Sequence, residues 1–347
     1  MAPIPVVAND IHRRHDPPFE LNAGQRIAPV YERPQRLEAI RREVEAAGHP
    51  ILPATEHPDR ALTEVHHPGL LAFLRDGYDA WRTAGGPDVM IPDTFRSPRW
   101  AAGGRASADP IAQAGWWCFD TSTPVVAGSY LAGRAAVDIA LTAAELVTSG
   151  EPIVYGLTRP PGHHAGADYY GGFCLFNHAA IAARQLTTGG RVAILDIDVH
   201  HGNGTQDIFW RDPEVLYVSL HGHPDHLYPS FSGFDDEIGE GPGRGTTRNL
   251  PLPRGTADAD YLVALTVALD QIDAFGPAVL VVSCGFDTSE HDPIGSLAVS
   301  VEGFAAVGRL IAALDLPTLL LQEGGYALDH LGRLAVALLD GLQTPPR

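Results

Sequence analysis

The sequence predicts an α/β protein in which a parallel β-sheet is covered by helices on both faces. From residue 127 onward, segments with helical apolar spacing alternate with short runs of aliphatic and β-branched residues, the pattern of successive βαβ units. The expected strands are apolar throughout, as in strands buried on both faces. With 347 residues and a hydrophobic content of 45%, the chain can form a large core. We expect one domain over residues 1–347.

The expected elements follow from local patterns. Two helices precede the alternating region: one at 34–47, with Pro34 at a first helical position and Gly48 at its end, and one at 68–82. The expected strands are 153–157, 192–198, 215–220, 278–284 and 318–321. The expected later helices are 127–149, 177–188, 258–275, 301–314 and 328–342. A long Gly- and Pro-rich loop over 221–257 is expected to line the site.

Residues 83–123 do not fit the alternation and are expected to form an insertion loop. The segment is rich in Gly, Pro, Ser and Asp and contains Trp100, Trp116 and Trp117. Long loops in compact domains are usually functional, and an exposed cluster of aromatic side chains marks an interaction surface. The insertion is therefore expected to cover a site or to pack on a second subunit. We expect a homodimer formed through it.

Composition and charge disfavour several classes of protein. The net charge of −18 disfavours nucleic-acid binding, which needs a basic surface, and it attracts cationic substrates. No apolar run approaches the roughly 20 residues of a membrane helix, and the N-terminus does not resemble a signal peptide. The cysteines Cys118, Cys174 and Cys284 form no Cys-x-x-Cys pair, which indicates reduced thiols. A cytoplasmic protein without membrane or nucleic-acid partners is expected.

Residues 192–206 carry the strongest functional signal. An apolar run is followed by Asp196, Asp198 and His200 at alternate positions, which project to one face of an extended strand. Carboxylates at the end of a buried strand are costly unless they pair or bind a metal. The glycines from Gly202 onward are expected to end the strand and open a loop. This stretch predicts a metal site.

Polar side chains also follow other expected strands. Ligands of open α/β sheets bind beyond the carboxyl ends of the strands, so these side chains should meet at one edge. They are His163 and His164 after 153–157, Asp287 after 278–284, and Tyr326 after 318–321. Asp198, His200 and Asp287 would then form a three-ligand set with an open position, as in catalytic metal sites. Two adjacent histidines suit proton transfer.

Five motifs resemble the signature set of the histone deacetylase and acetylpolyamine amidohydrolase superfamily. They are Arg159-Pro-Pro-Gly-His-His-Ala165, Gly171-Gly-Phe-Cys-Leu-Phe-Asn177, Asp196-Ile-Asp-Val-His-His-Gly-Asn-Gly-Thr-Gln206, Gly285-Phe-Asp287 and Glu323-Gly-Gly-Tyr326. The resemblance runs from about residue 32 to the C-terminus and is nearest to bacterial acetylpolyamine amidohydrolases and class II-like deacetylases. It implies the arginase/deacetylase fold, with a central parallel sheet of about eight strands.

The resemblance also implies a set of catalytic and metal-binding residues. The implied ligands of one Zn²⁺ per chain, with Fe²⁺ as the alternative metal, are Asp198, His200 and Asp287. The implied catalytic residues are the tandem histidines His163, oriented by Asp196, and His164, oriented by Asn203, together with Tyr326 as a donor to the oxyanion. The residues implied for a K⁺ ion are Asp196, Asp198, His200, Ser219 and Leu220.

Substrate-binding residues are implied in the same way. Those of the expected substrate tunnel are Gly172, Phe173 and Tyr228. Acetylpolyamine amidohydrolases place an acidic residue in the insertion to bind the distal ammonium, and Ile111 stands near that position here. Asp109 lies close to it in the sequence.

The implied function is zinc-dependent removal of an acetyl or other acyl group from a small acylated amine such as an acetylpolyamine, with release of acetate. The alternative enzyme is a deacetylase acting on acetyl-lysine in peptides or proteins. Ureohydrolases share the fold but need an aspartate two residues beyond Asp287, where this chain has Ser289. A non-enzymatic acyl-amine sensor would be expected to lack Tyr326 or a tandem histidine, and the sequence retains them.

Overall fold

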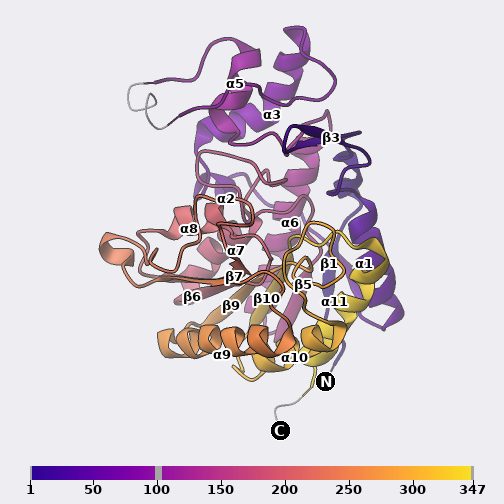
Figure 1. Cartoon of the computed structure of the whole chain (residues 1–347), viewed down its shortest axis with the longest axis vertical. Helices are drawn as coiled ribbons and strands as arrows, with labels where there is room; N and C mark the ends of the chain where they lie inside the picture. Colours follow the sequence, from indigo (N-terminus) through magenta and orange to yellow (C-terminus); the bar gives the residue numbers. More distant parts are fainter. Residues whose placement is uncertain (1, 98–103, 345–347) are drawn as a thin grey trace.

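The computed structural model describes residues 2–97 and 104–344, and its centre is an eight-stranded sheet (Figure 1). The strands are, in spatial order, β4 (Ile51–Pro53), β1 (Val6–Ala8), β5 (Ile153–Gly156), β10 (Thr318–Gln322), β9 (Val279–Cys284), β6 (Val192–Asp196), β7 (Val215–Gly222) and β8 (Thr247–Leu252). All neighbouring pairs in this sheet are parallel. A separate antiparallel hairpin pairs β2 (Glu20–Asn22) with β3 (Gln25–Ile27).

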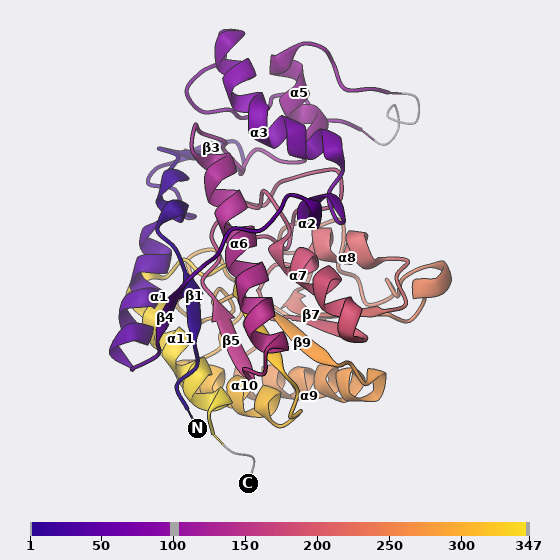
Figure 2. The same cartoon turned by 180° about the vertical axis from the view of Figure 1, so that it is seen from behind.

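Helices pack on both faces of the large sheet (Figures 1 and 2). The helices whose apolar residues pack on one face are α1 (Gln35–Ala46), α9 (Asp258–Phe275), α10 (Val301–Ala312) and α11 (Leu328–Leu342). Those on the other face are α6 (Ser129–Thr148) and α7 (His178–Leu186). The remaining helices are α2 (Arg60–Thr63), α3 (Pro68–Thr83), α5 (Pro110–Trp117) and α8 (Asn203–Phe209), with 3₁₀ turns η1 (Ile11–Arg14), η2 (Thr187–Gly189) and η3 (Gly241–Gly243).

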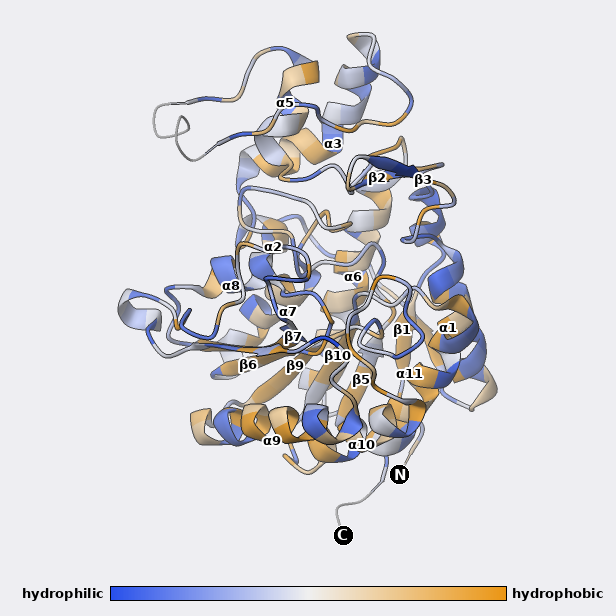
Figure 3. Cartoon of the chain, viewed as in Figure 1, coloured by the Kyte–Doolittle hydropathy of each residue, from blue (hydrophilic) through white to orange (hydrophobic). Residues whose placement is uncertain are grey.

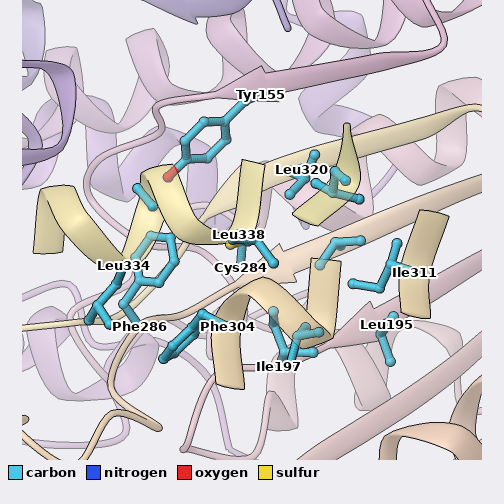
Figure 4. Packing of buried hydrophobic residues seen from close by; sticks show 14 of the residues in the cluster. Tyr155, Leu195, Ile197, Cys284, Phe286, Phe304, Ile311, Leu320, Leu334 and Leu338 are labelled. Atoms are coloured by element: carbon cyan, nitrogen blue, oxygen red, sulfur yellow. The ribbon is translucent and has the colours of Figure 1, made fainter. Parts of the chain in front are cut away.

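Alternation along each strand divides the buried residues between two cores. Leu320 belongs to the core beneath α10 and α11, whereas Leu319 and Leu321 belong to the core beneath α6 and α7, because successive strand side chains point to opposite faces. Figure 4 shows Leu320 in the first core with Leu334 and Leu338 of α11. In Figure 3 the central strands are largely hydrophobic, while β2 is hydrophilic. Within the described residues, no helix is both long and apolar enough to cross a membrane.

The five expected strands and the seven expected helices are confirmed, with ends that differ by a few residues. The hairpin strands β2 and β3 were not expected. Three strands of the large sheet were not expected either: β1 and β4, each of three residues, and β8, which includes Pro251. All three lie in the outer part of the sheet, and β8 lies inside the predicted loop 221–257. Short strands that contain proline give little periodic signal.

Two expectations, one about the end of a strand and one about the insertion, are wrong. The strand expected to extend to residue 198 ends at Asp196, and the glycines after it lead into α8 rather than a loop. Gly204 meets a packing need there, because a Cβ atom at this position would lie 2.3 Å from the Ala165 carbonyl oxygen. A side chain larger than hydrogen would separate α8 from the turn that carries the tandem histidines.

The insertion 83–123 is not a continuous loop, since residues 110–117 form α5. Pro110 occupies a first-turn position and the Asp109 side chain accepts a hydrogen bond from the Ile111 N–H, which caps the helix. Trp117 is buried against α3, where a Cβ on Gly69 would meet its ring at 2.7 Å. Trp116 is half-buried, and Trp100 lies outside the described residues.

Candidate active site

A cavity of about 400 Å³ opens where the strands end. The predicted site residues that line it are His163, His164, Gly172, Phe173, His200, Tyr228 and Tyr326. The histidine pair follows β5, His200 follows β6 and Tyr326 follows β10, so segments far apart in the sequence meet at one edge of the sheet. The arrangement is that of ligand sites in parallel α/β sheets.

Three buried side chains at the end of β6 and β9 form a metal-ligating cluster. The candidate ligand atoms of Asp198, His200 and Asp287 lie within 4.8 Å of one another. The Nδ1 atom of His200 lies 3.2 Å from Asp198 Oδ1 and 3.2 Å from Asp287 Oδ2. A Cβ atom on Gly324 would lie 2.1 Å from Asp287 Oδ2, and one on Gly285 would lie 2.3 Å from Asp198 Oδ2. Glycine at both positions keeps the space around the carboxylates open.

Backbone N–H groups fix the two carboxylates of this cluster. Asp198 Oδ2 accepts a hydrogen bond from the Gly324 N–H at 2.7 Å, and Asp287 Oδ1 accepts one from the Val199 N–H at 2.8 Å. The second oxygen of each acid faces the His200 ring, and that of Asp198 also accepts the His200 N–H at 2.9 Å. Such outer contacts orient ligands for a metal.

The protonation behaviour of the cluster fits a divalent cation. Burial raises the pKa of Asp287 to about 7, and the neighbouring Asp198 carboxylate raises it as well. Burial acts on Asp198 in the same direction, but the positive His163 and hydrogen bonds from His200 lower its pKa overall. Two buried carboxylates at this separation repel each other when both are ionised. A bound cation would remove that repulsion, and the O/N/O donor set matches zinc.

The tandem histidines have different partners and opposite pKa shifts. His163 Nδ1 lies 3.0 Å from Asp196 Oδ2, whereas His164 Nδ1 lies 2.7 Å from the amide oxygen of Asn203. Burial lowers the pKa of His163, but the carboxylates of Asp196 and Asp198 outweigh it and raise the pKa to about 10. Burial and the positive charge of His163 hold the pKa of His164 well below its usual value.

When the pKa values of two neighbouring groups are shifted in opposite directions, one group can act as an acid and the other as a base. Here the division gives a protonated imidazole at His163 and a neutral one at His164. A neutral imidazole can accept a proton, so His164 has the properties of a general base.

Tyr326 completes the inner end of the cavity. Gly325 before it has φ +116°, a conformation that favours glycine. The Arg36 guanidinium lies 4.6 Å from the Tyr326 ring centroid and donates hydrogen bonds to the Glu323 and Gly325 carbonyl oxygens. Burial raises the pKa of Tyr326 well above its usual value. The phenol therefore remains protonated and can donate a hydrogen bond.

Gly172, Phe173 and Tyr228 form the cavity walls. Phe173 meets the Tyr326 ring edge-to-face at 5.8 Å, and Tyr228 meets His164 edge-to-face at 5.0 Å. A Cβ atom at position 172 would lie 2.3 Å from Cδ2 of His164, and the residue has φ +56°. Glycine is needed there for both reasons.

Comparison with known proteins identifies the family. The model of the histone deacetylase domain matches residues 30–342. The chain belongs to the histone deacetylase family. The acetylpolyamine amidohydrolase of Mycoplana ramosa is 38% identical over 340 residues, which cover 97% of this chain and 99% of that protein. The family membership expected from the motifs is thereby confirmed.

Solved structures of the family share the fold. The crystal structure of acetylpolyamine aminohydrolase from Burkholderia pseudomallei matches with a TM-score of 0.93 at 37% identity, covering 97% of this chain and 98% of that chain. The HDA15 HD domain matches with a TM-score of 0.78 at 30% identity, covering 98% and 88%. The expected arginase/deacetylase fold with an eight-stranded parallel sheet is confirmed.

Seven predicted residues are not among those that line the cavity. Four of them, Asp196, Asp198, Asn203 and Asp287, contact the lining histidines, and the other three are Ile111, Ser219 and Leu220. Ile111 lies at the start of α5, where its side chain packs partly buried against the second core, and it is not among the described residues that line the cavity. Ser219 and Leu220 are buried in β7. Asp196 pairs in register with Ser219, whose hydroxyl lies 2.8 Å from His221 Nδ1. Of the residues predicted for K⁺, Asp196 and Ser219 are neighbours across β6 and β7, whereas the Leu220 side chain packs in the core, and Ile111 is not brought to the cavity.

Several lining residues were not predicted. They are Leu21, Asn22, Ala23, Asp120, Thr121, Ser122, Pro161, Leu227 and Ile294. Asp120 is followed by hydroxyl residues that bond back to its carboxylate, and Asp followed by Ser and Thr is a recognisable turn signal. The β2–β3 hairpin is short and polar, so its sequence gives no comparable signal.

Proposed function

We propose that this chain is a metal-dependent amidohydrolase that removes the acetyl group from a small acylated amine, such as an acetylpolyamine, and releases acetate and the free amine. The carrying observation is the buried Asp198, His200 and Asp287 cluster beside two histidines with opposite pKa shifts. Relatives named acetylpolyamine amidohydrolase, 38% identical over nearly their whole lengths, support the substrate class.

Asp198, His200 and Asp287 would hold one divalent cation, and we propose Zn²⁺ with Fe²⁺ as the alternative. Bound there, the cation would supply Lewis acidity to the amide carbonyl and to a water molecule. His164 accepts the proton of that water as its oxygen bonds to the carbonyl carbon. The Tyr326 O–H donates to the developing oxyanion. The proton then passes from the histidine pair to the amine nitrogen as the C–N bond breaks.

The proposal is tested by measuring acetate release from the Zn²⁺-loaded protein. The substrates are N-acetylputrescine, acetylspermidine and an acetyl-lysine peptide, and Asp287→Ala is the blank. The chain contains no lysine, so labelling with an amine-reactive dye gives little background from the protein. Chromatography then separates the labelled product from the labelled substrate, which has a free amine of its own. Acetate and amine in equal amounts, abolished in the blank, support the proposal; no release from any substrate contradicts it.

A lysine deacetylase is the second candidate function, since the family model that matches residues 30–342 is named for histone deacetylases. The two candidates differ in the order of kcat/KM among the three substrates. A higher value for the peptide than for either acetylpolyamine would favour the deacetylase.

We also propose three properties that follow from the family. A K⁺ ion would bind at Asp196, Asp198, His200, Ser219 and Leu220, and exchange of K⁺ for a bulky organic cation should lower activity. A homodimer would form through 83–123, which sedimentation measures. A cytoplasmic location agrees with three buried free cysteines, and cell fractionation tests it.

A further inference from the structure

Asp120, a lining residue of the cavity, accepts hydrogen bonds from several neighbours. Its Oδ2 accepts bonds from the Gly172 N–H at 2.8 Å, the Tyr228 hydroxyl at 2.9 Å and the Ser122 hydroxyl at 2.6 Å. Its Oδ1 accepts bonds from the Thr123 hydroxyl at 3.0 Å and the Ser122 N–H at 3.2 Å. These five hydrogen bonds exceed the roughly four lone-pair sites of one carboxylate, so some donors share a site.

These bonds connect the two walls of the cavity. On one side, Gly172 and Phe173 have φ values of +56° and +66°, and a positive φ is unfavourable for a phenylalanine. Their N–H groups are held by Asp120 and by Thr123, whose hydroxyl accepts the Phe173 N–H at 2.9 Å. On the other side, Asp120 holds Tyr228, which contacts His164. One carboxylate therefore sets the separation of the walls.

The same carboxylate brings a negative charge to the wall. Apart from Asp120, the described lining residues are neutral side chains and three histidines. The donors to Asp120 are hydroxyl and N–H groups of Ser122, Thr123, Gly172 and Tyr228, together with a long contact from the Cys118 thiol at 4.0 Å. Neutral donors stabilise a carboxylate without cancelling its charge. A cation in the cavity would therefore be attracted to Asp120.

We propose that Asp120 is a positioning and specificity-determining residue: it holds the Phe173 and Tyr228 walls together, and its charge favours acylated amines that carry a second, cationic amine. This inference rests on the proposed amide hydrolysis. It assigns to Asp120, in place of Ile111, the attraction for the distal ammonium. Asp109 does not share this role, because it caps α5 and is not among the described lining residues.

The test compares two substrates that differ in one charge. N-acetylputrescine ends in an ammonium group, and N-pentylacetamide has a methyl group in its place. In Asp120→Asn an amide oxygen remains to accept hydrogen bonds from Gly172 and Tyr228. The two walls therefore stay connected, while the negative charge of the carboxylate is lost. Asp109→Asn is the matched control, since it removes the same charge outside the cavity and asparagine also caps helices.

We expect kcat/KM of Asp120→Asn to fall about tenfold for N-acetylputrescine, chiefly through KM, and to change less than about twofold for N-pentylacetamide. Asp109→Asn should leave the ratio of the two values unchanged. Tyr228→Phe, which loses a wall bond but no charge, should lower kcat/KM for both substrates equally. Thermal denaturation of each variant verifies that it is folded.

Three outcomes overturn the inference. The first is an equal loss for both substrates in Asp120→Asn, and the second is a change of the ratio in Asp109→Asn as large as that in Asp120→Asn. The third needs only the wild-type protein and applies even if the variant does not fold: a kcat/KM for the cationic substrate no higher than that for the neutral one. Failure of the proposed function is distinct, because the wild-type protein would then release acetate from neither substrate.

Discussion

The Nδ1 atom of His164 lies 2.7 Å from the side-chain oxygen of Asn203. An amide oxygen fixes the ring proton on Nδ1 and leaves Nε2 with its lone pair, but it adds no negative charge. The adjacent His163 faces the Asp196 carboxylate instead, and its pKa is raised to about 10. The two histidines therefore differ in pKa because one faces a carboxylate and the other a neutral amide.

Replacing the neutral partner of His164 should change the pH dependence of catalysis. In Asn203→Asp the new carboxylate favours the protonated imidazole and raises the pKa of His164, which is low in the native protein. The base must be neutral to act, so the acidic limb of the kcat/KM profile should move to higher pH by about one unit. Asn203→Ala removes the hydrogen bond without adding charge and should not move the limb upward. An unshifted limb in Asn203→Asp would contradict the role of His164.

Loss of the Tyr326 hydroxyl should affect the chemical step alone. In Tyr326→Phe we expect kcat to fall about 10²–10³-fold, because one donor to the oxyanion is missing. The bound metal, measured by elemental analysis, should remain equal to wild type since Tyr326 is not in the ligand cluster. Tyr31→Phe is a matched control, as Tyr31 packs edge-to-face on Tyr326 at 6.3 Å and does not line the cavity. Near-normal turnover of Tyr326→Phe would exclude it as the donor.

Metal binding should depend on Asp287 and stabilise the fold. Adding Zn²⁺ at 100 times its dissociation constant should raise the free energy of unfolding of the wild-type protein by about 2.7 kcal/mol. Asp287→Asn should show neither this rise nor bound zinc. Asp329→Asn, an exposed position in α11, should behave as the wild type. Zinc retained in Asp287→Asn at full affinity would mean that the cation binds elsewhere.

Glu323 should make the metal-free protein less stable as pH rises. Burial raises the pKa of this side chain from 4.5 to about 8, so between these values the folded state binds more protons than the unfolded state. The free energy of unfolding contributed by Glu323 is therefore lost as pH increases from 4.5 to 8. Glu323→Gln lacks this titration, and its stability should fall less over that range, by on the order of 3 kcal/mol. Urea denaturation in chelator at pH 5 and pH 8.5 measures the difference; parallel behaviour would refute it.

The central part of the fold could be predicted because its strands are buried and long. The strands that end at Asp196 and Cys284 are apolar runs with clear boundaries. The polar residues after them were expected to meet because the carboxyl ends of parallel strands lie at one edge of the sheet. The end of a strand within Asp196-Ile-Asp198 could not be predicted, since the alternation of polar and apolar residues continues beyond the last strand hydrogen bond.

The walls were harder to predict than the metal cluster. Leu21 to Ala23 reach the cavity from a hairpin that is short and polar, and the connection depends on tertiary contacts over long sequence separations. Asp120 bonds to Tyr228 from 108 positions away. No local pattern encodes such a pair. Ile111 was expected at the site only from the family resemblance, and it lies in the first turn of α5, which Asp109 caps.

The metal-ligating cluster follows strands of the sheet, whereas many other residues around the cavity come from the connections between elements. The cluster of Asp198, His200 and Asp287 is fixed by strands and backbone hydrogen bonds, whereas residues 21–23, 120–122 and 227–228 come from three separate connections. A change in one connection need not disturb the strands, whereas the hydrogen bond from Tyr228 to Asp120 couples two of the connections to each other. Evolution could therefore alter which molecules enter while the hydrolytic groups stay in place, and a laboratory search for new substrates should randomise those three segments first.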